Sequence, residues 1–302
     1  MSGMRAWSVV VGLMLVAACA RQAPEGTVRG PGEPDRAARP RVVLVNLNLS
    51  AEKTEAYKAI RTLVKKLAPG VRVKIVHYPR LTSAKIQRLA AAALILGPQS
   101  TPWAEYEPGS LDRAMAAVRA YDGPVLGICG GQQFLALAYG GEVSPMECPD
   151  GAKGYAGCVP EEGFVAVDVV ADDPLFKDIP RKAGFMEQHF EEVKRLPDGF
   201  EALASTARCR VQAMRRSGKP VYGVQFHPER YSDSKTAGRQ LIWNFLEIAG
   251  LVQPVPNVAG TALPGATDRA GEETGKGGAL DRAGEETGKE GALVRAGEET
   301  GK

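Results

Sequence analysis

One stretch of the chain decides the fold: Pro124-Val125-Leu126-Gly127-Ile128-Cys129-Gly130-Gly131-Gln132-Gln133. A short apolar run ends in a cysteine next to two glycines, and a helix-compatible segment, Gln133 to Tyr139, follows. This order predicts a strand that turns sharply into a helix with Cys129 at the turn. Glycines permit the strained backbone of such an elbow, and the positive end of the helix dipole favours a thiolate there. The alternative is a buried cysteine at an ordinary strand–helix junction.

A second motif supplies the groups that a thiol nucleophile needs. The apolar segment 220–226 ends in His227-Pro228-Glu229, in a chain with three histidines. The two-residue spacing puts His227 and Glu229 on one side of an extended segment. A nucleophile requires a base and a group that orients the base. We therefore expect Cys129, His227 and Glu229 to form a catalytic set.

Strand and helix patterns alternate between Arg41 and Leu251. They predict strands at 42–47, 71–76, 92–96 and 125–128, and helices at 52–67, 83–91, 111–121 and 234–248, with Gly250 as the last helix stop. Residues 164–226 are richer in β-formers and turns. The expected fold is α/β, with a mainly parallel sheet, helices on both faces and some antiparallel additions.

The two motifs resemble those of class I glutamine amidotransferases, which read roughly P-x-x-G-x-C-x-G-x-Q and F-H-P-E. Residues 185–189 and 196–205 are similar to the amidotransferase domain of GMP synthetase, and the resemblance covers Arg41 to Leu251. It implies a flavodoxin-like fold and hydrolysis of glutamine through a thioester on Cys129. His227 would move the proton and Glu229 would hold the imidazole.

The resemblance also implies roles for residues around the nucleophile. The backbone N–H groups of Gly97 and Gly130 would stabilise the oxyanion. Gln133 and the backbone around Gln188 and His189 would hold the amino-acid end of the substrate. Two positions depart from the family: Gln99 replaces a glycine and Gln188 a small hydroxyl residue. A structural role on a strand remains open for His189, and His77 is interpreted as structural.

The ends of the chain differ from its core. Residues 1–19 are typical of an export signal, with a basic residue, an apolar segment and small residues before Cys19. This ending resembles a bacterial lipobox, which implies lipidation of Cys19 and membrane anchoring; a plain secretory signal is the alternative. Residues 20–40 are expected to form a flexible tether. Residues 254–302 contain repeats with a period of thirteen residues and are expected to be disordered.

Composition limits the remaining function classes. The net charge of +3 on 302 residues, without a basic cluster, favours no nucleic-acid partner. Cys148 and Cys158 can pair in an oxidising compartment, which would leave Cys209 over. We expect no cofactor, and no metal site because ligand spacings are absent. The predicted function is that of an exported hydrolase of glutamine or a γ-glutamyl compound. A separate ammonia-accepting protein is a possible partner, and the alternative is an inactive scaffold lipoprotein.

Overall fold

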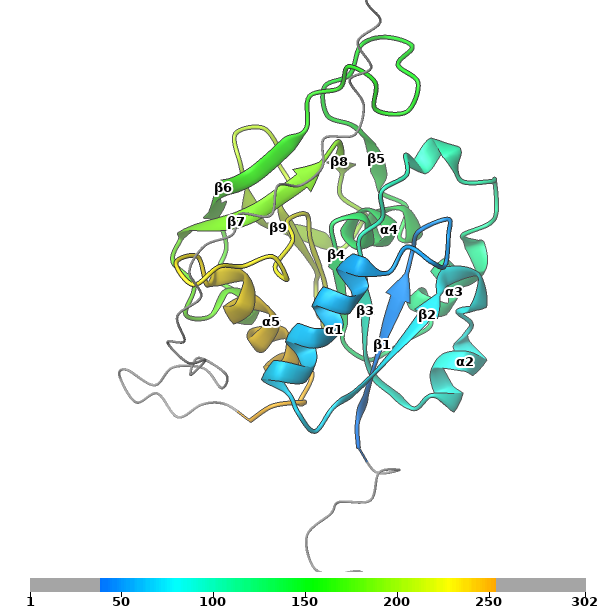
Figure 1. The fold of residues 1–302 in the computed structure, drawn as a ribbon, viewed down its shortest axis with the longest axis vertical. Coiled ribbons are helices and arrows are strands. Elements are labelled where there is room, and N and C mark those ends of the chain that lie inside the picture. Colours follow the sequence, from blue (N-terminus) through cyan, green and yellow to red (C-terminus); the bar gives the residue numbers. More distant parts are fainter. Residues whose placement is uncertain (1–38, 254–302) are drawn as a thin grey trace, which may run out of the picture. The chain divides into compact units, whose positions relative to one another are not determined.

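The computed structural model describes residues 39–253 (Figure 1). The predicted signal and tail lie outside the described residues, as does all of the tether except residues 39 and 40. A nine-stranded sheet has the order β2-β1-β3-β4-β11-β10-β9-β6-β7. Its strands are β1 (Arg41–Asn46), β2 (Arg72–His77), β3 (Ala91–Leu96), β4 (Val125–Ile128), β6 (Glu161–Val169), β7 (Lys182–His189), β9 (Phe200–Ser205), β10 (Ala213–Arg216) and β11 (Val221–Val224).

The first five strands of this order are parallel, and helices cover both of their faces. One face packs against α1 (Glu55–Leu67) and α5 (Ala237–Ile248), whose buried residues join one core cluster. The other face packs against α2 (Ser83–Arg88), α3 (Asp112–Arg119) and α4 (Gly130–Ala138). Strands such as β1 and β4 are apolar along their length because both of their faces are buried.

The rest of the sheet is antiparallel, from β11 through β10, β9 and β6 to β7. A separate two-stranded sheet pairs β5 (Glu142–Pro145) with β8 (Glu191–Arg195). Three short 3₁₀ helices complete the elements: Tyr78–Arg80, Trp103–Glu105 and Pro174–Phe176. The predicted α/β fold, with a parallel sheet and antiparallel additions, is confirmed.

Helix boundaries differ from the predicted ones for local reasons. α1 begins at Glu55, not at residue 52, because Thr54 is its N-cap and the preceding residues form a turn. α4 begins at Gly130, before the predicted Gln133, because the helix starts directly after the elbow. α5 begins at Ala237 rather than residue 234 and ends as expected, with Gly250 at φ 65°.

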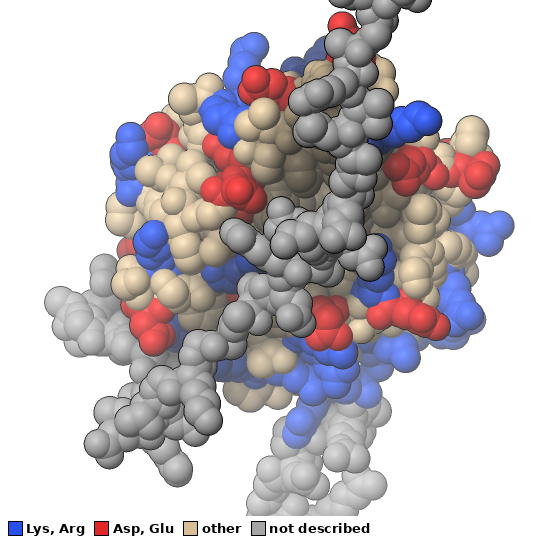
Figure 2. All heavy atoms as spheres, turned by 45° about the horizontal axis from the view of Figure 1, so that its top comes forward, with Lys and Arg blue, Asp and Glu red and all other residues tan. Residues whose placement is uncertain are grey.

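The surface of the described residues carries both signs of charge. Figure 2 shows lysine and arginine side chains in several parts of one face, interspersed with aspartate and glutamate. Within residues 39–253, no helix is both long enough and apolar enough to cross a membrane.

Candidate active site

Cys129 lies at the carboxyl end of β4, where the chain turns into α4. Its backbone has φ 52° and ψ −111°, a region that side chains other than glycine rarely adopt. Its N–H donates to the Val224 carbonyl at 2.8 Å, which ties the elbow to β11. Close packing requires a glycine at position 131, since a Cβ on Gly131 would lie 2.1 Å from the Leu96 carbonyl oxygen. The strained elbow places the sulfur above the start of a helix, as the sequence predicts.

His227 and Glu229 follow β11, the strand next to β4. Parallel pairing sets Val224 beside Ile128, so the chain after each strand emerges at the same sheet edge. His227 Nδ1 is 2.8 Å from Glu229 Oε1, and both side chains are buried. Burial alone would lower the pKa of His227. The Cys129 sulfur and the Glu229 carboxylate, with hydrogen bonds to both, nevertheless raise that pKa well above 6.5. The structure thus brings all three predicted catalytic residues together.

Two buried glutamines hold the sulfur from the other side. Gln225 Nε2 is 3.7 Å from Cys129 Sγ, and Gln225 Oε1 accepts from Gln133 Nε2 at 3.1 Å. Gln133 Nε2 also donates to the Glu191 carbonyl at 2.6 Å, while Gln133 Oε1 accepts from Trp103 Nε1 at 2.8 Å. Both polar groups of Gln133 are therefore engaged by protein atoms. Gln133 borders the cavity, but it would have to exchange these bonds to hold a substrate directly.

The two glycines predicted to stabilise an oxyanion differ in their surroundings. The Gly97 N–H donates to the Val45 carbonyl at 3.0 Å, continuing the ladder between β3 and β1. In this structure that N–H is committed to the sheet, so the predicted oxyanion role would require this bond to be given up. Gly130 is the first residue of α4, where backbone N–H groups have no intrahelical acceptor. Gln99 packs directly over it, with its backbone nitrogen 2.9 Å from where a Gly130 Cβ would be.

A cavity of about 500 Å³ opens beside the thiol. Its walls include Asn48, Tyr57, Gln99, Cys129, Gln188 and His227. The exposed Gln188 side chain accepts a hydrogen bond from Arg230 Nη1 at 2.6 Å, and Gln188 thus lies at the rim. The Gln188 carbonyl oxygen is 4.0 Å from Cys129 Sγ. The predicted contact through the backbone around residue 188 is therefore placed at the nucleophile.

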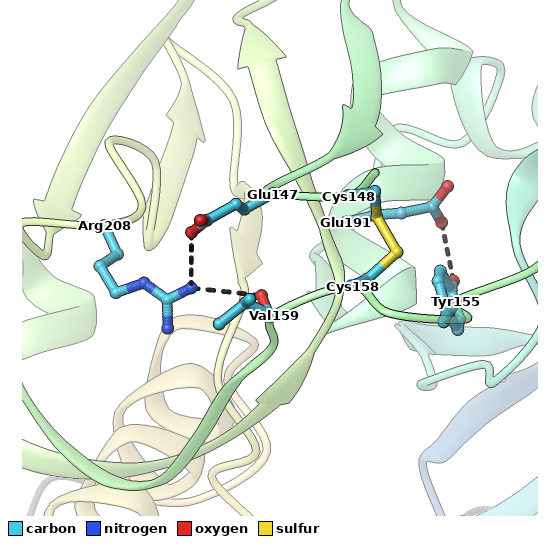
Figure 3. The surroundings of a disulfide bond; sticks show 7 residues. All are labelled: Glu147, Cys148, Tyr155, Cys158, Val159, Glu191 and Arg208. Atoms are coloured by element: carbon cyan, nitrogen blue, oxygen red, sulfur yellow. Dashed lines mark hydrogen bonds and ion pairs between the residues drawn. A yellow bond between two sulfur atoms is a disulfide. The ribbon is translucent and has the colours of Figure 1, made fainter. Parts of the chain in front are cut away.

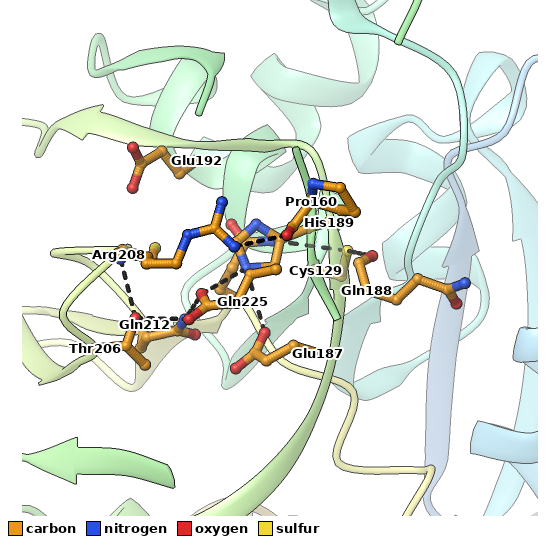
Figure 4. Close-up of polar contacts among 12 residues, drawn as sticks. Cys129, Pro160, Glu187, Gln188, His189, Glu192, Thr206, Arg208, Gln212 and Gln225 are labelled. Atoms are coloured by element: carbon orange, nitrogen blue, oxygen red, sulfur yellow. Dashed lines mark hydrogen bonds and ion pairs between the residues drawn. The ribbon is translucent and has the colours of Figure 1, made fainter. Parts of the chain in front are cut away.

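His189 borders the cavity, but its ring faces the protein interior (Figure 4). Its Nδ1 is 3.0 Å from the Glu191 carbonyl, and its Nε2 is 3.2 Å from Glu161 and 3.3 Å from Glu187. Burial opposes protonation, but hydrogen bonds to the two carboxylates raise the pKa of His189 to about 10. Both ring nitrogens are engaged, which favours the structural role among the two alternatives. His77 is structural too, with Nε2 2.7 Å from the Asn48 carbonyl.

A disulfide closes a loop at the edge of the cavity (Figure 3). Cys148 and Cys158 are joined, which confirms the predicted pairing and leaves Cys129 and Cys209 as the free cysteines within residues 39–253. Tyr155, inside this loop, donates to Glu191 Oε2 at 3.0 Å and stacks on Phe190 with ring centroids 4.4 Å apart. The crosslinked loop thereby supplies an aromatic wall to the site.

The sequence interpretation missed several residues of the site: Tyr57, Trp103, Tyr155, Glu191 and Gln225. Gln225 alone had a local signal, because it precedes Phe226 and His227 at the end of a predicted strand. The others come from loops and helices whose approach depends on tertiary packing.

These features are those of an α/β cysteine hydrolase with a nucleophile elbow. The sequence model of the family "Glutamine amidotransferase class-I" matches residues 55–249. The chain therefore belongs to the class I glutamine amidotransferase family.

The relatives narrow this class, and they are named as one subunit of GMP synthase [glutamine-hydrolyzing]. The chain is 43% identical over 131 residues to this protein from Archaeoglobus fulgidus, covering 43% of this chain and 64% of the relative. It is 34% identical over 142 residues to the corresponding protein from Pyrococcus furiosus, covering 47% of this chain and 69% of the relative. The chain thus spans somewhat under two thirds of the Archaeoglobus relative and slightly more of the Pyrococcus one.

Solved structures agree on the fold. A Thermoplasma acidophilum protein provisionally assigned to the same GMP synthase subunit superposes with a TM-score of 0.58 at 27% identity, covering 70% of this chain and 94% of that one. A glutamine amidotransferase from Thermotoga maritima superposes with a TM-score of 0.53 at 16% identity, covering 70% and 98%. The second likeness concerns the fold alone.

Proposed function

We propose that this protein hydrolyses the γ-carboxamide of glutamine, or of a γ-glutamyl compound, through a thioester on Cys129. The observation that carries the proposal is the juxtaposition of Cys129 at a strained elbow with His227, whose Nδ1 is 2.8 Å from Glu229. Cys129 attacks the carboxamide carbon, and His227 delivers the proton to the departing ammonia or amine. Water, activated by the same histidine, then hydrolyses the thioester to the free carboxylate.

The preorganised charge supports this chemistry. The raised pKa of His227 keeps the imidazole protonated beside the sulfur, which favours the thiolate form of the nucleophile. The start of α4 adds its positive dipole end, and the N–H of Gly130 is the first candidate donor to the oxyanion. Gly97 remains a candidate second donor only if its bond to Val45 opens during the reaction.

The partner proposal follows from the relatives. They are named as one subunit of a glutamine-hydrolysing GMP synthase, so the partner we propose for this chain is a separate, ammonia-accepting protein. The described residues form one amidotransferase-type domain and hold no second fold that would accept ammonia. A stand-alone hydrolase and an inactive scaffold are the alternatives that the assay below separates.

We also propose export with lipidation at Cys19, at the bacterial cell surface or periplasmic side of a membrane. The support is the pattern of residues 1–19, together with the Cys148–Cys158 disulfide, which is typical of proteins in oxidising compartments. A Cys19→Ser variant should lose lipid and move to the soluble fraction. Recovery of the native protein from the cytosol with residues 1–19 intact would overturn this proposal.

The test of the chemistry is release of ammonia from glutamine and of amine from γ-glutamyl peptides. Cys129→Ser should abolish turnover, and His227→Ala should cost nearly as much because the residues act as a unit. Glu229→Gln should cost less, since it alters only the orientation of the base. A glutamine-like electrophile should label Cys129 and spare Cys209, because burial raises the pKa of the Cys209 thiol. Equal labelling of both thiols with no turnover of any amide would favour the scaffold.

A further inference from the structure

A second group of chemically reactive side chains lies behind the cavity wall and plays no part in the proposed hydrolysis. It brings together Glu161 at the start of β6, Glu187 and His189 at the end of β7, and Cys209 in the loop between β9 and β10. One ligand atom each from Glu161, His189 and Cys209 lies within 4.8 Å of the others. All four residues are buried. We propose that they form a structural site for one divalent metal ion of the zinc class.

The orientation of the histidine supports a cation at this position. His189 Nδ1 lies 3.0 Å from the Glu191 carbonyl, which can only accept, so the Nδ1 hydrogen donates there. In the neutral ring, Nε2 then presents its lone pair to Glu161 and Glu187, at 3.2 and 3.3 Å. A lone pair facing two carboxylates requires a positive charge between them. Histidines that bind metals commonly donate their other ring N–H to a backbone carbonyl in this way.

Glu187 supplies the second, independent observation. Its side chain is fully buried, and neither carboxylate oxygen has a hydrogen-bond partner among the described residues. An unpaired buried carboxylate is costly, and buried charges are normally paired or bound to a metal. Figure 4 shows Glu187 beside His189 on the side away from solvent-exposed Gln188. A metal ion bound by Nε2 of His189 would supply the missing partner of Glu187.

The surrounding bonds resemble an outer shell of ligand supports. Gln212 Nε2 donates to Glu161 Oε2 at 2.7 Å, and Thr206 Oγ1 donates to Glu161 Oε1 at 2.9 Å. The Cys209 N–H donates to the same Thr206 hydroxyl at 2.9 Å. One threonine therefore positions two of the proposed ligands. Such supports are a regular part of metal sites in proteins.

The donor set suits zinc. One sulfur, one imidazole nitrogen and two carboxylates make a closed four-coordinate site, which is the structural type. Bonds of about 2.0 Å to nitrogen and about 2.3 Å to sulfur place tetrahedral ligands about 3.5 Å apart, so the cluster must contract by about 1 Å at its widest. Cys209 lies in a loop that can make this shift. Binding would form a metal–sulfur bond and release the thiol proton of Cys209 to solvent.

The test uses the full chain with Cys19→Ser, freed of metal by chelator in non-reducing buffer. Titration with Co²⁺ should give a thiolate–cobalt charge-transfer band that saturates at one equivalent and is displaced by Zn²⁺. Zinc at about a hundred times its Kd should raise the Tm by about 5–10 °C. Cys209→Ser should lose the charge-transfer band, whereas the matched variant Cys129→Ser should keep it.

Two further variants protect the test against misfolding. Glu187→Gln keeps the side-chain volume and should weaken zinc binding at least tenfold, and Gln212→Met should weaken it by about 10–100-fold through the support of Glu161. Absence of the band in the folded protein would overturn the proposal and leave a proton on His189 as the cation. Loss of the band in Cys129→Ser would also overturn it, by placing the metal at the nucleophile. Neither outcome depends on turnover of glutamine.

Discussion

Replacing Gly97 by alanine separates two roles for this glycine. Alanine keeps the backbone N–H, so a glycine needed only as a hydrogen-bond donor tolerates the change. The structure indicates a different requirement, because a Cβ at this position would lie 2.2 Å from Cε1 and 2.8 Å from Cζ of Tyr57. The Tyr57 ring is buried and cannot move freely. Its hydroxyl accepts from Leu47 N–H at 2.9 Å and donates to the Pro98 carbonyl.

The size of the effect follows from this overlap. Carbon atoms normally approach to about 3.5–4.0 Å, so the alanine methyl would overlap the ring by more than about 1 Å. Overpacking of this kind costs about 1–3 kcal/mol, and the tethered ring favours the upper end. For a domain of this size, about 3 kcal/mol lowers the Tm by about 6–12 °C. Glutamine hydrolysis should fall as well, because Pro98 and Gln99 border the cavity and would shift with the ring.

The assay is a thermal melt of Gly97→Ala, of Tyr57→Leu and of the double variant. If the clash is the cause, the double variant should be at least about 1 kcal/mol more stable than the sum of the single changes. Gly70→Ala is the matched control, because its Cβ would meet no atom within 4 Å. An unchanged Tm in Gly97→Ala, or strictly additive losses, would refute the steric explanation.

Three further predictions concern the thiol, the loop and the base. Gln225→Leu should slow electrophile labelling of Cys129 by about tenfold, since it removes the amide 3.7 Å from the sulfur and a donor to a charged group contributes about 1.5–3 kcal/mol; unchanged kinetics would show that this amide does not act on the thiol. Cys158→Ser should lower stability by about 2–3 kcal/mol in denaturant titrations, through loss of a short crosslinked loop, and should raise KM because Tyr155 is released; an unaffected KM would separate the loop from the site. The raised pKa of His227 contributes stability that is fully present below about pH 6.5 and is lost as the pH rises through the folded-state value, so the Tm advantage of wild type over His227→Gln should shrink from about pH 6 to about pH 9. A constant or growing advantage would contradict the assigned direction.

Local patterns were sufficient to predict the elbow and the neighbouring catalytic strand. The segment 125–128 is apolar and ends in glycine-flanked Cys129, so the strand, the turn and the order of motifs were readable from the sequence. The role of Gln133 was not readable, because its engagement depends on Trp103 and Gln225, which are 30 and 92 residues away.

The expected absence of a metal site shows the same limitation from another side. Spacing rules detect ligands that are close in sequence, such as paired cysteines. The ligands proposed here come from residues 161, 187, 189 and 209, on two strands and a loop that only the antiparallel extension brings together. Likewise, the small size required at Gly97 depends on Tyr57, a helix residue 40 positions earlier whose approach no local pattern reveals.

The segment that carries His227 also affects how the molecule behaves at high concentration. β7 is the last strand of the sheet, and strands at an open edge can pair with other molecules and start aggregation. The His227 N–H donates to the Met186 carbonyl of β7 at 2.8 Å, so part of that edge is already occupied. The opposite edge strand, β2, is short and carries the exposed Lys74, a charge that opposes pairing. Disorder or cleavage near the catalytic histidine would therefore uncover a strand edge, and would promote self-association in addition to loss of activity.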